Sequence, residues 1–142
     1  MATIKQTLKQ LTTSKKYYFT TCGDSIYLRK HGVNYPLFHA RNENYMKHYL
    51  NAMIKCKGLI RINDENIFEM ANAIGMIISL YTYGRGSLEA VLNDKYMANY
   101  RISQDVKRTL AEYVINAICK VIYCSGEDGE GNTYHSCELV EV

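Results

Sequence analysis

The chain has 142 residues, a net charge of +3 and 47% apolar residues. This length fits one domain, and this apolar content is sufficient for a packed core, which excludes an intrinsically disordered chain. We therefore expect a single domain over residues 1–142. The net charge conceals an asymmetry, because residues 1–57 carry ten Lys or Arg against two acids, whereas residues 124–142 carry five acids and no base.

The sequence has no pattern typical of secreted or membrane proteins. The first residues lack the apolar segment of a secretion signal. The most apolar stretch, residues 71–83, is interrupted by polar residues and is too short to cross a bilayer. The five cysteines, an odd number without a secretion signal, favour reduced thiols. We expect a cytoplasmic protein with no membrane partner.

The N-terminal third predicts one helix and a three-stranded meander. Helical spacing of apolar residues starts after Thr3, which can form a capping box with Gln6. Three strand-like segments follow, and glycine-containing turns separate them: residues 16–21, 26–29 and 33–37. These segments are rich in aromatic and β-branched residues or alternate apolar and polar side chains with a period of two. Pro36 cannot donate a ladder hydrogen bond, so the third strand is expected at an edge of the sheet.

The rest of the chain predicts mainly helices. Polar residues that can cap a helix precede four apolar-periodic segments: Asn42, Asn63 or Asp64, Ser87 and Ser103. The helix after Asn63 or Asp64 is apolar on most sides and is predicted to be central, and the last helix extends to Val121. A short strand is predicted at residues 59–62, an acidic loop at 124–132 and a strand at 134–142.

Together these elements predict an α+β fold. The sheet has three to four mostly antiparallel strands, namely the N-terminal meander and a C-terminal strand that could add to it. About four to five helices pack on this sheet. Strand–helix–strand alternation does not recur in the sequence, which argues against a wound α/β fold.

Four residues near the C-terminus are weak candidates for metal ligands: Cys119, Cys124, His135 and Cys137. Zinc accepts three thiolates and one imidazole in a tetrahedral site. The spacing here lacks the tight ligand pairs of known structural zinc sites. Buried apolar cysteines and an ordinary histidine are the simpler interpretation. We therefore expect no metal, and no cofactor motif occurs in the chain.

Cysteine-based catalysis is an alternative function. Cys22 lies in a predicted turn, and His31 and His39 follow nearby in the sequence. A Cys–His pair requires contact in space, which sequence does not show. No common nucleotide-binding or catalytic motif occurs. An enzyme with a spatially assembled Cys/His site thus remains an alternative, and a non-catalytic protein is the preferred hypothesis.

The segment 81–108 contains the preferred candidate binding residues. Its tyrosines and arginines lie near two predicted helix starts: Tyr81, Tyr83, Arg85, Tyr96, Tyr100, Arg101 and Arg108. Tyrosine and arginine are enriched at the energetic centres of protein interfaces. Aromatic rings beside arginines at helix starts also suit a phosphate or a nucleotide. The alternative is a helix corner whose tyrosines merely reach towards water.

The meander is a second candidate. Its basic residues alternate with tyrosines: Lys15, Lys16, Arg29, Lys30 and Arg41 with Tyr17, Tyr18, Tyr27 and Tyr35. Single-stranded nucleic acids are held by such combinations of charge and stacking. The alternative is that lysine and arginine protect a sheet edge from pairing with other chains.

The sequence resembles no particular family. As a short chain without motifs, with free cysteines and many Tyr, Asn, Lys and Ile residues, it resembles in style the small accessory proteins of phages and other mobile elements. Many of those proteins act by stoichiometric binding, including antagonists of bacterial defence systems, and the resemblance assigns no role to any single residue. We therefore expect a non-catalytic inhibitor that acts through protein–protein interaction. The alternative partner is an anionic ligand, either a nucleotide or a nucleic acid, held by residues 81–108. A homodimer is compatible with each hypothesis, since two-fold dimers are the commonest assemblies.

Overall fold

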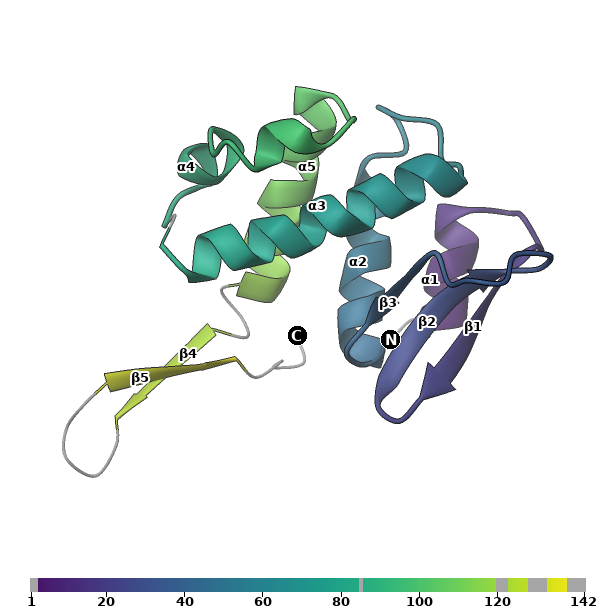
Figure 1. Ribbon diagram of the computed structural model, residues 1–142, viewed down its shortest axis with the longest axis horizontal. Helices are drawn as coiled ribbons and strands as arrows, with labels where there is room; N and C mark the ends of the chain where they lie inside the picture. The colour runs from purple at the N-terminus through teal and green to yellow at the C-terminus, as the bar shows by residue number, and fades with distance from the viewer. Residues whose placement is uncertain (1–2, 85, 120–122, 128–132, 138–142) are drawn as a thin grey trace.

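The computed structural model describes residues 3–84, 86–119, 123–127 and 133–137, the last two ranges as backbone (Figure 1). The helices, in chain order, are α1 (Ile4–Leu11), α2 (Glu43–Lys55), α3 (Asp64–Thr82), α4 (Leu88–Leu92), the 3₁₀-helix η1 (Met97–Asn99), α5 (Gln104–Val114) and the π-helical turn η2 (Ile115–Cys119). The strands are β1 (Tyr17–Cys22), β2 (Ser25–Lys30), β3 (Phe38–Ala40), β4 (Tyr123–Glu127) and β5 (Thr133–Cys137). The predicted α+β class is confirmed.

Each α-helix of the described residues begins at a polar side chain that the sequence predicted as its cap. The side-chain oxygen of each cap accepts a hydrogen bond from the backbone N–H three residues further along the chain. The caps are Thr3, Asn42, Asn63, Ser87 and Ser103. This contact satisfies one of the N–H groups that the first turn leaves without a helical partner. The caps therefore fix where the helices start.

The first three strands form an antiparallel sheet in the order β1–β2–β3. Leu28 in the central strand lies opposite Phe19 on one side and Phe38 on the other. The ring of Phe38 stacks against Tyr49 of α2, with ring centroids 6.0 Å apart. The apolar face of the sheet is therefore covered by α2, and Figure 1 shows α1 beside it on the same side.

The central position of α3 is also confirmed. Figure 1 shows α3 crossing α2 and α5. Four large apolar side chains recur at helical spacing along α3 and are fully buried: Ile67, Met70, Ile74 and Ile77. Burying a side chain of this size stabilises the fold by roughly 1.5–3 kcal/mol. These four residues join the helical layer to the rest of the core.

Two strand predictions in the first half of the chain were wrong. The third strand lies at Phe38–Ala40 instead of residues 33–37, although it is at an edge as expected. Leu37 and Phe38 are both buried, and this consecutive pair ends the alternation of the preceding residues. The expected strand at 59–62 is a turn, because the N–H groups of Leu59 and Ile60 both donate to the carbonyl of Cys56.

The C-terminal strand exists but does not join the meander. β5 pairs antiparallel with β4 in a separate two-stranded sheet, so β4 occupies part of the predicted acidic loop. The last helix also differs from the prediction, since its α-helical part ends at Val114 and continues as a π-helical turn to Cys119. Residues 120–122 lie outside the described residues.

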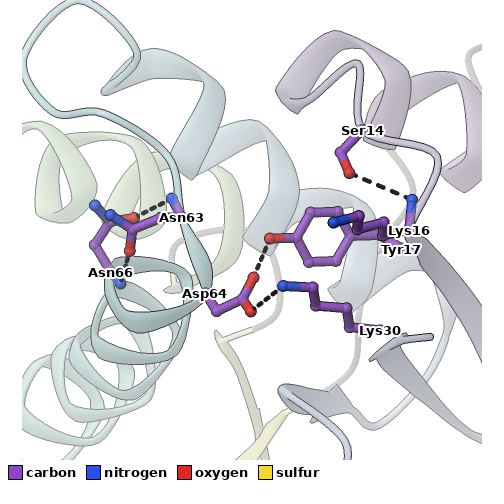
Figure 2. Close-up of polar contacts among 7 residues, drawn as sticks. All are labelled: Ser14, Lys16, Tyr17, Lys30, Asn63, Asp64 and Asn66. Carbon is purple, nitrogen blue, oxygen red and sulfur yellow. Dashed lines mark hydrogen bonds and ion pairs between the residues drawn. The ribbon is translucent and has the colours of Figure 1, made fainter. Parts of the chain in front are cut away.

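A polar contact joins the sheet to the start of α3. Figure 2 shows Tyr17 of β1 and Lys30 of β2, which are opposite each other in the register, converging on the carboxylate of Asp64. The Tyr17 hydroxyl donates to Oδ1, and Lys30 Nζ lies 2.6 Å from Oδ2. The hydrogen bond from Lys30, followed by that from Tyr17, lowers the pKa of Asp64. This contact links the first turn of α3 to the helical side of the sheet.

Candidate binding surfaces

The structure brings together only part of the predicted corner at residues 81–108. Tyr83 is 89% exposed and Tyr96 is 48% exposed. Both line a hollow of about 320 Å³ at the C-terminal end of α3, together with Met76, Leu80 and Asp94. The Asp94 carboxylate accepts a hydrogen bond from the Tyr96 backbone N–H at 2.9 Å. The hollow is therefore apolar with an acidic group, which does not favour an anion.

The other corner residues are used mainly for packing and ion pairing. Tyr81 and Tyr100 are half-buried against the core, and burial raises the pKa of Tyr100. The Arg108 guanidinium pairs with Glu89 at 2.6 Å. Arg101 is exposed, and its backbone N–H donates to Glu69. Arg85 lies outside the described residues. The corner does not form one basic pocket.

The meander residues divide between the two faces of the sheet. Adjacent residues of a strand point to opposite faces, and directly paired residues share a face. Tyr17 and Lys30 are on the helical side, where they contact Asp64. Tyr18 pairs with Arg29 across the sheet and lies on the other face. Tyr27 is two residues before Arg29 in β2, so its side chain lies on the same face as Arg29. The described helices lie on the first side, so the second faces solvent.

Aromatic rings are paired on this solvent-facing side. The ring of His31 stacks on Tyr18 with centroids 4.3 Å apart and an interplanar angle of 22°. The ring of His39 packs on Tyr27 with centroids 5.4 Å apart. Both histidines are exposed, whereas the tyrosines and Arg29 are half-buried. We call this surface the sheet face: Tyr18, Tyr27, Arg29, His31 and His39.

A basic groove adjoins the sheet face, and the sequence analysis missed it. It lies between α1 and β1, has a volume of about 600 Å³ and is lined by Lys5, Lys9 and Lys15 with the apolar side chains of Leu8 and Phe19. No acidic side chain lines it, and Thr12, Thr13 and Ser14 add hydroxyl groups. Tyr18 lines the groove as well as the sheet face. We call it the lysine groove. The spacing of Lys5 and Lys9, one helical turn apart, was the only local signal for it.

Three further residues of the predicted meander site, Lys16, Tyr35 and Arg41, lie outside the sheet face and the lysine groove. Lys16 is exposed just before β1. The Arg41 guanidinium lies over the Tyr45 ring, 4.7 Å from its centroid, and donates to its hydroxyl. Tyr35 is 68% exposed in the loop before β3. Arg41 is thus engaged at the start of α2, away from the sheet face.

The sheet register separates the residues of the predicted cysteine site. Cys22 is at the end of β1, whereas His39 is in β3, and β2 lies between these strands. Neighbouring strands are about 4.8 Å apart, so the two backbones are roughly 10 Å apart. His31 lies beyond the opposite end of β2 and stacks on Tyr18. A second thiol, Cys56, is buried, and burial raises its pKa to about 11.

Three of the four candidate metal ligands, Cys124, His135 and Cys137, lie in the β4–β5 hairpin, which the structure describes as backbone only. In the hairpin register Cys124 is opposite Ser136, and His135 is opposite Ser125. Cys119 is buried in the π-helical turn. Within the described residues, no group of three histidine, cysteine or acidic side chains has the geometry to hold a metal ion.

His48 and Tyr113 form a further pair of titratable groups that sequence analysis did not identify. His48 Nδ1 on α2 lies 3.2 Å from the Tyr113 hydroxyl on α5. Burial lowers the pKa of His48, with a contribution from Lys47, and raises the pKa of Tyr113. Both shifts favour the neutral forms. The pair is therefore a hydrogen bond between two groups, on neighbouring helices, that are both favoured in their neutral forms.

Comparisons with known proteins gave no family model, no curated protein and no solved structure that matches the chain. Among the described residues, no helix combines the length and the apolarity needed to span a membrane. We therefore infer the function from the surfaces described above.

Proposed function

We propose that this protein acts by non-catalytic, stoichiometric association with a partner macromolecule, and that it uses the sheet face to do so. The observation that supports this is the two ring pairs beside Arg29 on the antiparallel sheet, where the Arg29 guanidinium donates to the Asn34 carbonyl at 3.1 Å. Side chains that a strand already holds in place lose little further conformational entropy when a partner binds. Tyrosine and arginine also contribute large binding free energies per residue. The helices on the other side of the sheet hold the surface in place.

The catalytic alternative has less support. The Cys56 thiol is kept protonated by burial, and the sheet holds Cys22 away from His39 by the width of β2. His48 is favoured in its neutral form in a hydrogen bond to Tyr113. These groups have structural partners that account for their positions.

The Tyr83–Tyr96 hollow is a second surface for the same function, and it favours a protein partner. Its two tyrosines are exposed and surround the apolar side chains of Met76 and Leu80. An apolar pocket with tyrosines at its edge suits an inserted apolar side chain of another protein. The hollow is smaller than the lysine groove. It belongs to the corner at residues 81–108, where the Arg108 guanidinium is already paired with Glu89.

Native mass spectrometry of the full-length protein, purified from its own host, tests the proposal. The wild type is expected to carry its partner at one copy per protein, and its effect on that partner to be complete at a one-to-one ratio. Tyr27→Ala with Arg29→Gln should release the partner, whereas Tyr83→Ala should retain it. The measured mass also shows whether the protein forms the homodimer that is compatible with this function.

Two results would contradict the proposal. One is turnover of a chemically modified partner by the protein at substoichiometric amounts. The other is a complex that the sheet-face variant retains as well as the wild type does. If Tyr83→Ala instead releases the partner, the hollow is the binding surface and the sheet face is not.

A further inference from the structure

Resting on the proposed function, we propose that the sheet face and the lysine groove together bind single-stranded nucleic acid, with bases stacked on the ring pairs and phosphates at the lysines. Single-stranded nucleic acid is thus the class of partner that we assign to the sheet face. It combines two observations that are independent in the structure, the ring pairs of the sheet face and the charge of the groove.

The ring pairs provide stacking positions for more than one base. Tyr18 is opposite Arg29 in the register, so Tyr27 is its diagonal neighbour on the same face. Diagonal neighbours in an antiparallel pair are about 7–8 Å apart. The Tyr18 and His31 rings are stacked, whereas the Tyr27 and His39 rings are tilted by 32°. In each pair the histidine is exposed, so its ring offers a base the face that the tyrosine does not cover. Tyrosine, histidine and arginine are side chains on which unpaired bases stack.

The groove provides charge where the nucleic acid backbone would continue. Lys5 and Lys9 project from α1, and Lys15 precedes β1 on the other wall. Tyr17 and Phe19 also line the groove from the helical side of the sheet, whereas Tyr18 lies on the sheet face. The two surfaces therefore meet at the edge strand β1, and a bound strand would pass around that edge. Lysine ammonium groups bind phosphates and release counterions. The groove hydroxyls of Thr12, Thr13 and Ser14 are additional donors for phosphate oxygens.

The same residues disfavour two other occupants. Lysine is depleted in the buried centres of protein interfaces, whereas it is common where phosphates are bound. A groove with three lysines and no acid therefore favours a polyanion over a protein. A DNA or RNA duplex hides the faces of its bases within its stack, so it cannot use the ring pairs of the sheet face. These considerations select the single strand.

The first measurement is fluorescence anisotropy with labelled oligo-dT and oligo-U of about 12 nucleotides, and with a duplex of equal length. We expect the full-length protein to bind the single strands more tightly than the duplex. Each phosphate contact of a single strand contributes about 0.7 to the slope of log affinity against log salt. Four such contacts, from Lys5, Lys9, Lys15 and Arg29, predict a slope near −3. This slope corresponds to a roughly 50-fold loss of affinity between 50 and 200 mM salt. The two oligonucleotides distinguish DNA from RNA.

Variants separate stacking from charge. Tyr27→Ala should weaken single-strand binding by about fivefold or more at every salt concentration, whereas Tyr27→Phe should retain it, because the ring is kept. Replacing Lys5, Lys9 and Lys15 by glutamine should reduce the slope to about −1, with binding still present at low salt. Phe68→Ala and Lys95→Gln are matched controls, since both residues are exposed and neither lines the sheet face, the lysine groove or the Tyr83–Tyr96 hollow. Circular dichroism melts show whether each variant is folded.

Each outcome bears on the inference. Absence of single-strand binding at 50 mM salt would overturn it, and so would equal binding of the duplex or a folded Tyr27→Ala variant with wild-type affinity. If the oligonucleotides fail but native mass spectrometry shows a one-to-one protein complex that depends on Tyr27 and Arg29, the partner is a protein and the proposed function stands. If both experiments fail, the sheet face is not a binding surface.

Discussion

Replacing Asp64 by asparagine tests the contact that joins the sheet to α3. Lys30 Nζ is 2.6 Å from Oδ2, and the side chains of Lys30 and Asp64 are 26% and 37% exposed. Solvent therefore screens this pair, which contributes about 0.5–1 kcal/mol. Asparagine still accepts from the Tyr17 hydroxyl, but the hydrogen bond loses its charge, at a cost of about 0.5–1 kcal/mol. Loss of a negative charge in the first turn of α3 costs about 0.3–1 kcal/mol.

These contributions overlap, so we expect Asp64→Asn to lower the free energy of unfolding by about 1–2 kcal/mol. For a domain of this length, that corresponds to a fall of roughly 3–8 °C in Tm. Urea unfolding and thermal melts followed by circular dichroism at pH 7 measure both quantities. Asp24→Asn is the matched control, because Asp24 is exposed in the turn after β1 and should change stability by less than about 0.5 kcal/mol.

The effect should also depend on pH in a defined direction. The folded pKa of Asp64 is lowered by Lys30 and Tyr17, so its contribution is fully present above the unfolded value of about 3.9. It is lost as the pH falls through the lower folded pKa, and the difference between wild type and Asp64→Asn should shrink there. A double-mutant cycle with Lys30→Gln isolates the ion pair. Equal stabilities for Asp64→Asn and Asp24→Asn at pH 7, or no coupling in the cycle, would refute this account.

Three further predictions concern the core and the titratable groups. Ile74→Ala should destabilise the protein by about 2–5 kcal/mol in urea, because Ile74 is fully buried in α3; a smaller loss would place it outside the core. The folded pKa of His48 is lowered, so stability should fall as the pH drops below the unfolded value of about 6.5, and His48→Gln should reduce this fall in acid melts. An unchanged pH profile would argue against His48 as the cause. Iodoacetamide should alkylate exposed Cys22 well before Cys56, whose pKa is raised to about 11 by burial, as peptide mass spectrometry would show; equal rates would contradict that burial.

Local features of the fold could be predicted from the sequence because their causes are local. Every predicted cap, from Thr3 to Ser103, acts on an N–H only three residues away. The turn between β1 and β2 is also local, since Gly23 has a φ of 62°, which glycine adopts without strain. The predicted strand at residues 59–62 failed because a local apolar run is compatible with both a strand and a turn, and the hydrogen bonds to Cys56 favour the turn.

The candidate site could be predicted only in part. Tyrosine, arginine and lysine content identified both the corner and the meander, but not which side chains were available for binding. Arg108 is paired with Glu89, 19 residues earlier, and Tyr81 is packed against the core. All lining residues of the lysine groove lie within residues 5–19, but the groove forms only because the chain turns back between α1 and β1, and the spacing of the lysines does not predict that turn.

The sequence by itself determined the α+β class, the starts of the helices and the alternation of side chains along the strands. Which face of the sheet is buried was decided only by tertiary structure. Tyr17 and Tyr18 are adjacent and chemically identical, yet one contacts Asp64, 47 residues away, and the other lies on the sheet face. The period of two fixes that they point in opposite directions, whereas packing of the helices against Leu28 and Phe38 fixes which direction is inward.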